Sequence, residues 1–127
     1  MRVVLDTSAI IWWTLDQTRL TTSAHAAISN ADELLISSVS VWEIGMADQK
    51  GRLILPVPFT EYVEDLLGLE RLSVCPVDVE TWVANLQLSW DHKDPADRTI
   101  VATAKERDLP LVTSDRRIRD FYPGAIW

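Results

Sequence analysis

The stretch Val-Val-Leu-Asp-Thr-Ser at residues 3–8 decides the fold class of this chain. Its three apolar residues, two of them β-branched, predict a short strand that is buried on both faces, as in a parallel sheet. Asp6 follows this strand directly and two hydroxyl residues come next, which is an unusual way for a chain to leave a buried strand. The stretch therefore predicts an α/β fold and a functional role for the edge of the sheet where the strand ends.

The remainder of the chain alternates short apolar strands with helices. Further strands are predicted at residues 34–36, 72–75, 111–113 and 125–127. Helices are predicted at residues 9–15, 22–30, 60–69, 79–86 and 95–107, the last with Asp94 as N-cap and Pro95 as first helical residue. Another helix is expected to begin at Ser38 or Ser40 and to stop at Gly51. This alternation predicts a parallel sheet with helices on both faces.

Length and composition restrict the class of protein. With 127 residues and no linker, repeat or low-complexity stretch, we expect a single domain spanning residues 1–127. The one cysteine, Cys75, excludes a disulfide framework and a four-cysteine zinc site. No apolar core of a signal peptide follows Met1, and the apolar run at residues 9–15 is too short to span a membrane. We therefore expect a cytoplasmic protein with no membrane segment.

The charge balance has two interpretations. The chain has 19 acidic and 12 basic residues and a net charge of −7, and an evenly spread excess of acid would argue against a nucleic-acid partner. Five of the acids, however, fall at comparable places in the predicted fold: Asp6, Glu43, Asp94, Asp97 and Asp115. Without them the chain is nearly neutral. Gathered acids indicate a cation site instead, and its cations would offset part of the repulsion toward phosphate.

Four of these acids are expected to converge on one edge of the sheet. Asp6 and Asp115 directly follow strands, Glu43 lies shortly after the second strand, and Asp97 lies in the first turn of a helix. Sites in open α/β sheets form beyond the carboxyl ends of the strands. Helix N-termini favour negative charge by only about 0.3–1 kcal/mol each, too little to hold four carboxylates together. A hard divalent ion such as Mg²⁺ or Mn²⁺ would neutralise them.

Each acid also has an ordinary structural interpretation. Ser40 and Glu43 fit a capping box, and Asp94 fits the N-cap of the helix that carries Asp97. Asp94 can also pair with Arg98, one turn further along that helix. The two acids that follow strands fit turn positions. The joint placement of four acids, and not any one of them, favours a metal site.

Four short motifs occur along the chain in a characteristic order. They are Leu-Asp-Thr-Ser-Ala at 5–9, Ser-Val-Ser-Val-Trp-Glu-Ile at 38–44, Asp-Pro-Ala-Asp-Arg at 94–98 and Leu-Val-Thr-Ser-Asp at 111–115. In this order and at this chain length the sequence resembles the PIN-domain ribonucleases. Its Trp-Glu segment is most similar to the VapC-type toxins of bacterial toxin–antitoxin pairs. The resemblance extends over nearly the whole chain.

The resemblance implies a fold, an activity and a set of site residues. The fold would be a three-layer α/β/α sandwich around a parallel sheet of four to five short strands. The activity would be Mg²⁺- or Mn²⁺-dependent cleavage of RNA by activated water. The family's acidic residues, which bind metal and act in catalysis, correspond to Asp6, Glu43, Asp97 and Asp115. Residues expected to orient carboxylates or waters are Ser8, Asp94 and Thr113. An antitoxin partner and a homodimer are implied as well.

Basic residues near the acids are the candidates for RNA contacts. They lie beside Asp97 or follow Asp115: Arg98, Arg116, Arg117 and Arg119. Most such residues in proteins are solvated or paired with acids, so each also has an ordinary surface interpretation. His92, two residues before Asp94, lies near the expected site and could contact substrate, although a loop residue is its ordinary interpretation; His25 is interpreted as a surface residue of a polar helix.

Three other classes of protein are alternatives to a metal-dependent ribonuclease. A receiver-like signalling module has a similar length and an acidic Mg²⁺ pocket, but it needs a lysine after a late strand, where this chain has Asp115. A phosphatase with two acids one residue apart after its first strand would need Asp in place of Ser8. A catalytically silent PIN-like interaction domain would have no need of the acidic residues.

Overall fold

The computed structural model describes residues 1–127 and contains a five-stranded parallel sheet. The strands are β1 (Arg2–Leu5), β2 (Glu33–Ser37), β3 (Leu72–Cys75), β4 (Leu111–Val112) and β5 (Ala125–Ile126). Their order across the sheet is β3-β2-β1-β4-β5, and every neighbouring pair is parallel. The predicted parallel sheet of four to five strands is therefore confirmed, and all its carboxyl ends meet at one edge.

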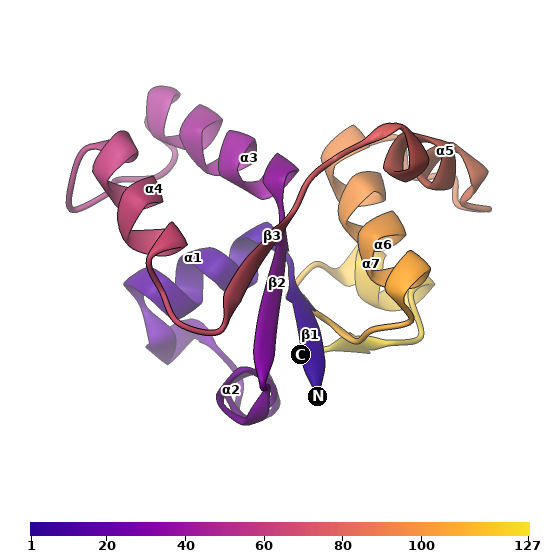
Figure 1. Ribbon diagram of the computed structural model, residues 1–127, viewed down its shortest axis with the longest axis horizontal. Helices are drawn as coiled ribbons and strands as arrows, with labels where there is room; N and C mark the ends of the chain where they lie inside the picture. The colour runs from indigo at the N-terminus through magenta and orange to yellow at the C-terminus, as the bar shows by residue number, and fades with distance from the viewer.

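Helices cover both faces of this sheet, which gives the three predicted layers. Figure 1 shows the first four helices on one side of the sheet and the last three on the other. They are α1 (Thr7–Leu15), α2 (Thr22–Asn30), α3 (Ser38–Gln49), α4 (Phe59–Leu67), α5 (Val79–Gln87), α6 (Pro95–Arg107) and α7 (Arg116–Phe121), with a 3-10 turn, η1 (Gln17–Arg19). None of these helices has the length and apolar character needed to cross a membrane.

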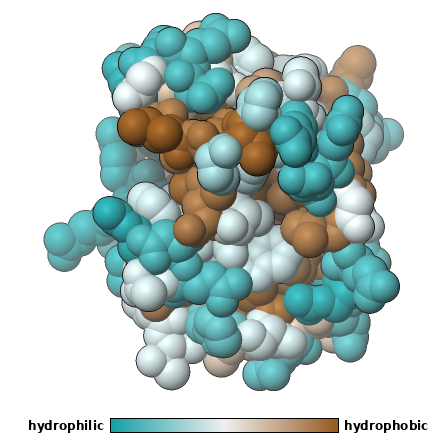
Figure 2. Space-filling model, turned by 90° about the vertical axis from the view of Figure 1, so that its left-hand side faces the viewer, coloured by the Kyte–Doolittle hydropathy of each residue, from teal (hydrophilic) through white to brown (hydrophobic).

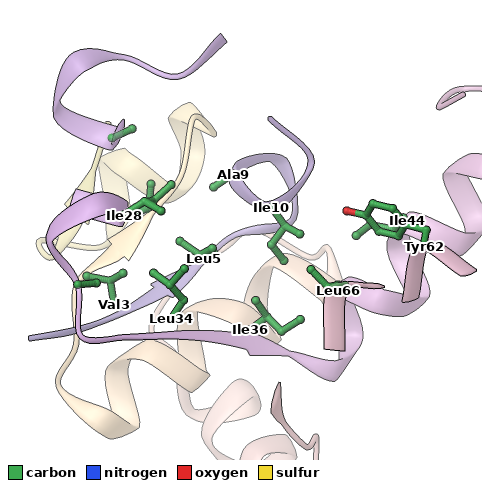
Figure 3. Packing of buried hydrophobic residues seen from close by; sticks show 13 residues of the cluster. Val3, Leu5, Ala9, Ile10, Ile28, Leu34, Ile36, Ile44, Tyr62 and Leu66 are labelled. Atoms are coloured by element: carbon green, nitrogen blue, oxygen red, sulfur yellow. The ribbon is translucent and has the colours of Figure 1, made fainter. Parts of the chain in front are cut away.

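The strands carry apolar side chains on both faces because each face has its own core. Successive side chains of a strand point to opposite sides, so Val3 and Leu5 pack toward α1 and α2 while Val4 packs toward α6. Figure 3 shows the first of these cores, in which strand residues meet side chains from α1 to α4. This double burial explains why β1, β2 and β4 contain continuous apolar runs, whereas two residues of the edge strand β3 are exposed.

The start of α3 differs from the predicted one. The N-cap is Ser37, whose hydroxyl accepts the Val39 N–H, and not Ser38 or Ser40. Glu43 consequently lies in the second turn of the helix and cannot reach back to cap Ser40, so the capping-box interpretation was wrong. The predicted end of the helix is confirmed, because Gly51 has a φ of +71°, a conformation that favours glycine.

The short helix α7 was not predicted from the sequence. Six residues are too few to show a helical period of apolar side chains. The helix forms because the Asp115 carboxylate accepts the N–H groups of Arg117 and Ile118, and because Ile118 is fully buried in the second core. A local cap and one tertiary contact thus define this element.

We predict that Leu5→Ala lowers the free energy of unfolding by about 2–5 kcal/mol, because it opens a cavity between the sheet and α1. Ile54→Ala is the matched control, since this residue is 88% exposed and its truncation is expected to cost less than about 0.5 kcal/mol. Urea unfolding monitored by tryptophan fluorescence measures both. Equal losses in the two variants would contradict the assignment of the core.

Candidate metal centre

Asp6 lies at the end of β1 with both carboxylate oxygens engaged. Oδ1 accepts the Thr7 N–H at 2.9 Å, which caps α1, and Oδ2 accepts the Thr113 hydroxyl at 2.6 Å. The Ser8 hydroxyl is 3.5 Å from the same Oδ2. The residue is only 5% exposed, and burial raises its pKa to about 6 against the lowering effect of the Thr113 hydrogen bond. The nearby carboxylates of Asp97 and Asp115 raise this pKa further.

Glu43 reaches the same region from the second turn of α3. Its Oε1 accepts the Thr7 hydroxyl at 2.5 Å, and that hydroxyl also lies 2.9 Å from the Ser40 hydroxyl. Burial raises the pKa of Glu43 to about 7, with the hydrogen bond from Thr7 acting in the opposite direction. The neighbouring Asp6 and Asp97 carboxylates add to the increase. Glu43 therefore holds a proton more readily than an ordinary surface glutamate.

The N-terminus of α6 contributes two more acids. Asp94 is the N-cap, and its Oδ1 accepts the Asp97 N–H at 2.9 Å, as predicted. Asp97 is half-buried, and its Oδ2 lies 2.7 Å from His92 Nε2. Burial raises the pKa of Asp97 although the His92 hydrogen bond opposes the shift. One carboxylate oxygen from each of Glu43, Asp94 and Asp97 lies within 4.8 Å of the other two.

Asp115 completes the set from the end of β4. Its Oδ1 caps α7 through the N–H groups of Arg117, at 2.8 Å, and Ile118, at 3.1 Å. The Asp115 N–H in turn donates to the Thr113 hydroxyl at 3.0 Å. Since Thr113 also donates to Asp6, one hydroxyl joins the ends of β1 and β4.

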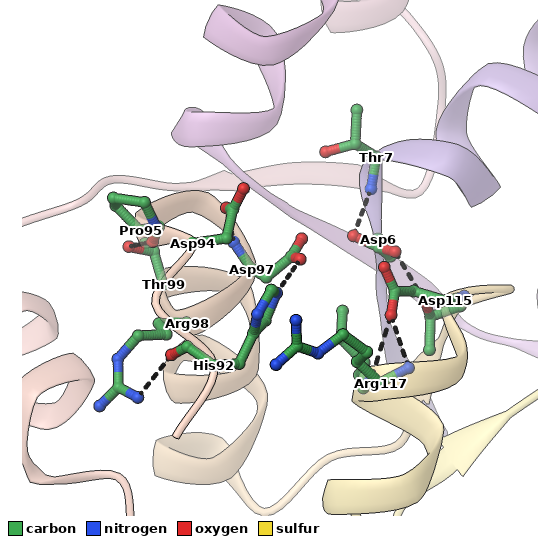
Figure 4. Close-up of polar contacts among 12 residues, drawn as sticks. Asp6, Thr7, His92, Asp94, Pro95, Asp97, Arg98, Thr99, Asp115 and Arg117 are labelled. Carbon is green, nitrogen blue, oxygen red and sulfur yellow. Dashed lines mark hydrogen bonds and ion pairs between the residues drawn. The ribbon is translucent and has the colours of Figure 1, made fainter. Parts of the chain in front are cut away.

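The four predicted acids line one small cavity. Its volume is about 220 Å³, and its lining contains no hydrophobic residue. The lining residues are Asp6, Thr7, Ser8, Glu43, Asp97, Ser114 and Asp115. Figure 4 shows Asp6, Asp97 and Asp115 pointing toward a common space from three different elements, with Asp94 beside them. The structure thus brings together acids that lie more than a hundred positions apart in the chain.

The donor set fits a hard divalent cation. Carboxylate and hydroxyl oxygens are the ligands that Mg²⁺ and Mn²⁺ prefer. The acids have almost no compensating charge, because the only ion pair that reaches them joins His92 to Asp97. Carboxylates placed this close either retain protons, as the raised pKa values of Asp6 and Glu43 indicate, or share a bound cation.

Sequence reasoning missed two residues of this region. Thr7 was noted only as a neighbour of Asp6, yet its hydroxyl orients Glu43. His92 was expected near the site as a loop residue or a substrate contact, and not as a partner of Asp97, yet its side chain contacts Asp97 and is only 12% exposed. The signal for His92 was its position two residues before Asp94; a contact between Thr7 and α3 has no local signal.

The four arginines proposed for RNA contacts have different surroundings. Arg116, Arg117 and Arg119 are exposed on α7 close to Asp115. Arg98 instead donates to oxygen atoms of the segment at residues 85–92. It does not pair with Asp94, the alternative that its spacing allowed.

Comparison with known proteins agrees with this geometry. A sequence model of the PIN domain matches residues 3–122. The chain is 36% identical to a protein named Ribonuclease VapC22 from Mycobacterium tuberculosis (strain ATCC 25618 / H37Rv) over 129 aligned positions, which cover 98% of each chain.

Two solved structures share the fold at low sequence identity. A toxin-antitoxin complex from Klebsiella pneumoniae has a chain that is 18% identical, with a TM-score of 0.67 and coverage of 98% of this chain and 96% of that one. VapBC2 from Rickettsia felis, bound to a DNA fragment from its promoter, has a chain that is 16% identical, with a TM-score of 0.68 and the same coverage. At such identities the likeness concerns the fold alone. With the domain match over most of its length and a relative 36% identical to it, the chain belongs to the PIN-domain family.

Proposed function

We propose that this chain is a Mg²⁺- or Mn²⁺-dependent ribonuclease and the toxin of a toxin–antitoxin pair. The observation that carries the proposal is the gathering of Asp6, Glu43, Asp97 and Asp115 around one polar cavity. A protein has little structural reason to collect four carboxylates with a single histidine as cationic partner. The relative named a ribonuclease supports the same activity. We further propose a cytoplasmic location, where such an RNA substrate would be found.

The residues of the cavity would have different roles. Asp6, Glu43 and Asp97 would hold a divalent cation, Asp115 would complete the site, and Asp94 lies near enough to assist. When bound, the cation supplies Lewis acidity, which activates water and offsets the negative charge that builds on the phosphate. Two hydroxyl groups hold the carboxylates in their orientations: Thr113 donates to Asp6 and Thr7 donates to Glu43.

RNA would approach along the exposed basic residues of α7. Arg116, Arg117 and Arg119 follow Asp115 directly and can contact phosphates on either side of the bond that is cleaved. Their charge lies beside an acidic cavity, so metal-free protein should bind RNA weakly. Arg98 is left out of this surface, because its guanidinium N–H groups already have acceptors.

An apolar groove supports the antitoxin part of the proposal. On the face shown in Figure 2, brown apolar surface lies exposed among teal polar side chains. A cavity of about 390 Å³ lies between the end of α1 and α4, with Trp13, Leu15, Val57, Leu66 and Leu69 among its lining. An apolar segment of a partner protein fits such a groove. The toxin–antitoxin complexes that share this fold are consistent with a partner of that kind.

A second apolar surface supports a homodimer. Helix α5 exposes an apolar stripe at the spacing i, i+3, i+4, i+7, consisting of Val79, Trp82, Val83 and Leu86. Such a stripe normally faces a protein interior. We propose that the same stripe of a second copy covers it, in the self-complementary manner of a two-fold dimer.

We predict that Asp6→Asn lowers the rate of metal-dependent RNA cleavage by at least about 100-fold, because it removes a charge from the cation site while keeping the side-chain size. Glu64→Gln, an exposed acid on α4, is the control and should cleave at the wild-type rate. The measurement is cleavage of a long RNA with Mg²⁺ or Mn²⁺. Near wild-type activity of Asp6→Asn would refute the assignment of the acids.

We predict that metal-free protein loses stability as pH rises. The folded-state pKa values of Asp6 and Glu43 are raised, from 3.8 to about 6 and from 4.5 to about 7. Their neutral forms therefore favour the folded state, and this contribution is fully present below about pH 4 and is lost as pH rises through about 6 to 7. Thermal unfolding should show a lower midpoint at about pH 8 than at about pH 5, and excess Mg²⁺ should raise the midpoint mainly at the higher pH.

The same measurement on Asp6→Asn provides the control. This variant cannot ionise at position 6, so its midpoint should fall less between the two pH values, and Mg²⁺ should raise it less. A pH dependence as steep as that of the wild type would contradict the burial of a titrating Asp6 carboxyl.

We predict that the wild-type chain is a dimer in solution and that Leu86→Glu makes it monomeric. Leu86 is 80% exposed in the single chain, so a charge there should disturb only an interface. Ile54→Glu, at an equally exposed loop position, should leave the dimer intact. Light scattering coupled to gel filtration gives the mass. A wild-type monomer, or a dimer that persists in Leu86→Glu, would refute the role of α5.

A further inference from the structure

Arg98 uses every N–H of its guanidinium group on one short segment. Nη1 donates to the carbonyls of Trp90 at 2.6 Å and His92 at 3.0 Å. Nη2 donates to the carbonyls of Asn85 at 2.6 Å and Leu88 at 3.2 Å. Nε donates to the Asn85 side-chain oxygen at 3.3 Å. Five donors are all that a guanidinium has, so this arginine has none left for a phosphate.

The positions of these acceptors explain why a positively charged side chain lies at the end of α5. The carbonyls of Asn85 and Leu88 lie at the carboxyl end of α5, where helix carbonyls lack partners and the helix dipole is negative. The segment that follows, residues 88–93, belongs to no helix or strand. Arg98 therefore closes the end of α5 and, through two further carbonyls, ties the following segment to the start of α6.

The segment held in this way carries His92, the one histidine that contacts the acidic cluster. His92 Nε2 lies 2.7 Å from Asp97 Oδ2. The imidazole packs against the Trp90 ring at a centroid distance of 4.9 Å. Trp90 in turn stacks on Phe121 of α7 at 4.6 Å with the rings 9° from parallel. Both the backbone and the rings around His92 are thus fixed from neighbouring elements.

We propose that Arg98 is a positioning residue: it holds residues 88–93 so that His92 donates to Asp97 and fixes the orientation of that carboxylate. The arginine that follows the acid in the Asp-Pro-Ala-Asp-Arg motif then acts through the backbone and a histidine, and not on the substrate. Partners that orient metal-ligating carboxylates tune affinity for the metal. The proposal rests on the metal-binding role given to Asp97 above.

Metal-free protein provides the first test. Long-range ¹H–¹⁵N NMR at neutral pH should find the His92 imidazole with its proton on Nε2 and slow to exchange, while exposed His25 serves as the internal reference. Arg98→Lys retains the charge but cannot supply five donors. In this variant the imidazole proton of His92 should exchange as fast as that of His25. A His92 signal that is unchanged in Arg98→Lys, or that already resembles His25 in the wild type, would overturn the proposal.

Metal and RNA measurements separate positioning from RNA contact. Arg98→Lys should raise the Mn²⁺ dissociation constant, followed by the electron paramagnetic resonance of free Mn²⁺, by about 10- to 100-fold. The KM for RNA at saturating Mn²⁺ should change less than about twofold, and the salt dependence of RNA binding should stay the same. A raised KM with unchanged Mn²⁺ affinity would instead make Arg98 an RNA contact and refute positioning.

A second variant keeps the proposal testable if Arg98→Lys fails to fold. His92→Phe retains a ring to pack on Trp90 but has no donor, and should weaken Mn²⁺ binding by a similar factor. Where both variants fold, the double variant should bind Mn²⁺ no more weakly than the single variant with the lower Mn²⁺ affinity, because both changes act on the same contact. Additive losses, or wild-type Mn²⁺ affinity in His92→Phe, would overturn it. Absence of RNA cleavage by wild-type protein that binds Mn²⁺ would refute the ribonuclease activity and leave the positioning role standing.

Discussion

Parallel pairing of β1 between β2 and β4 is the constraint on which the site depends. It places the carboxyl ends of these three strands at one edge, so the chain that leaves each of them enters the same small space. Of the acids at the candidate site, Asp6 follows β1 directly, Asp115 lies three residues after the end of β4, and Glu43 comes from the helix that follows β2. Burial is the main cause of the raised pKa values of Asp6 and Glu43, and the neighbouring carboxylates add to the increase, so the ionised forms of these gathered acids oppose folding.

Three of the acids at the candidate site also cap helices. Asp6, Asp94 and Asp115 are each the N-cap of a helix, and each accepts backbone N–H groups through Oδ1. The structural and the functional interpretations of these residues are therefore compatible. The caps fix Oδ1 of each carboxylate, and in Asp6 the Thr113 hydroxyl also holds Oδ2. The negative charge also lies at helix N-termini, where the dipole favours it.

The net charge of −7 takes on a different meaning in this arrangement. An acidic chain is a poor partner for RNA if its charge is spread evenly, but here a group of acids surrounds one cavity with exposed arginines of α7 nearby. Negative charge in the cavity and positive charge on α7 are thus separated by only a short distance. A bound cation would complete this pattern, since it turns the acidic cavity into a place where phosphate can lie.

The parallel sheet, most of the helices and the four candidate acids were predictable from the sequence, because apolar runs, N-caps and motif order are local properties that need no knowledge of contacts. The sequence did not predict the start of α3, where Ser37, Ser38 and Ser40 can all cap a helix, nor α7, which one aspartate and one buried isoleucine define. The partners of Thr7, His92 and Arg98 became clear only in the folded structure. Those contacts join segments whose side chains and carbonyls meet only after the sheet has formed, and a donor's choice among distant acceptors leaves no pattern along the chain.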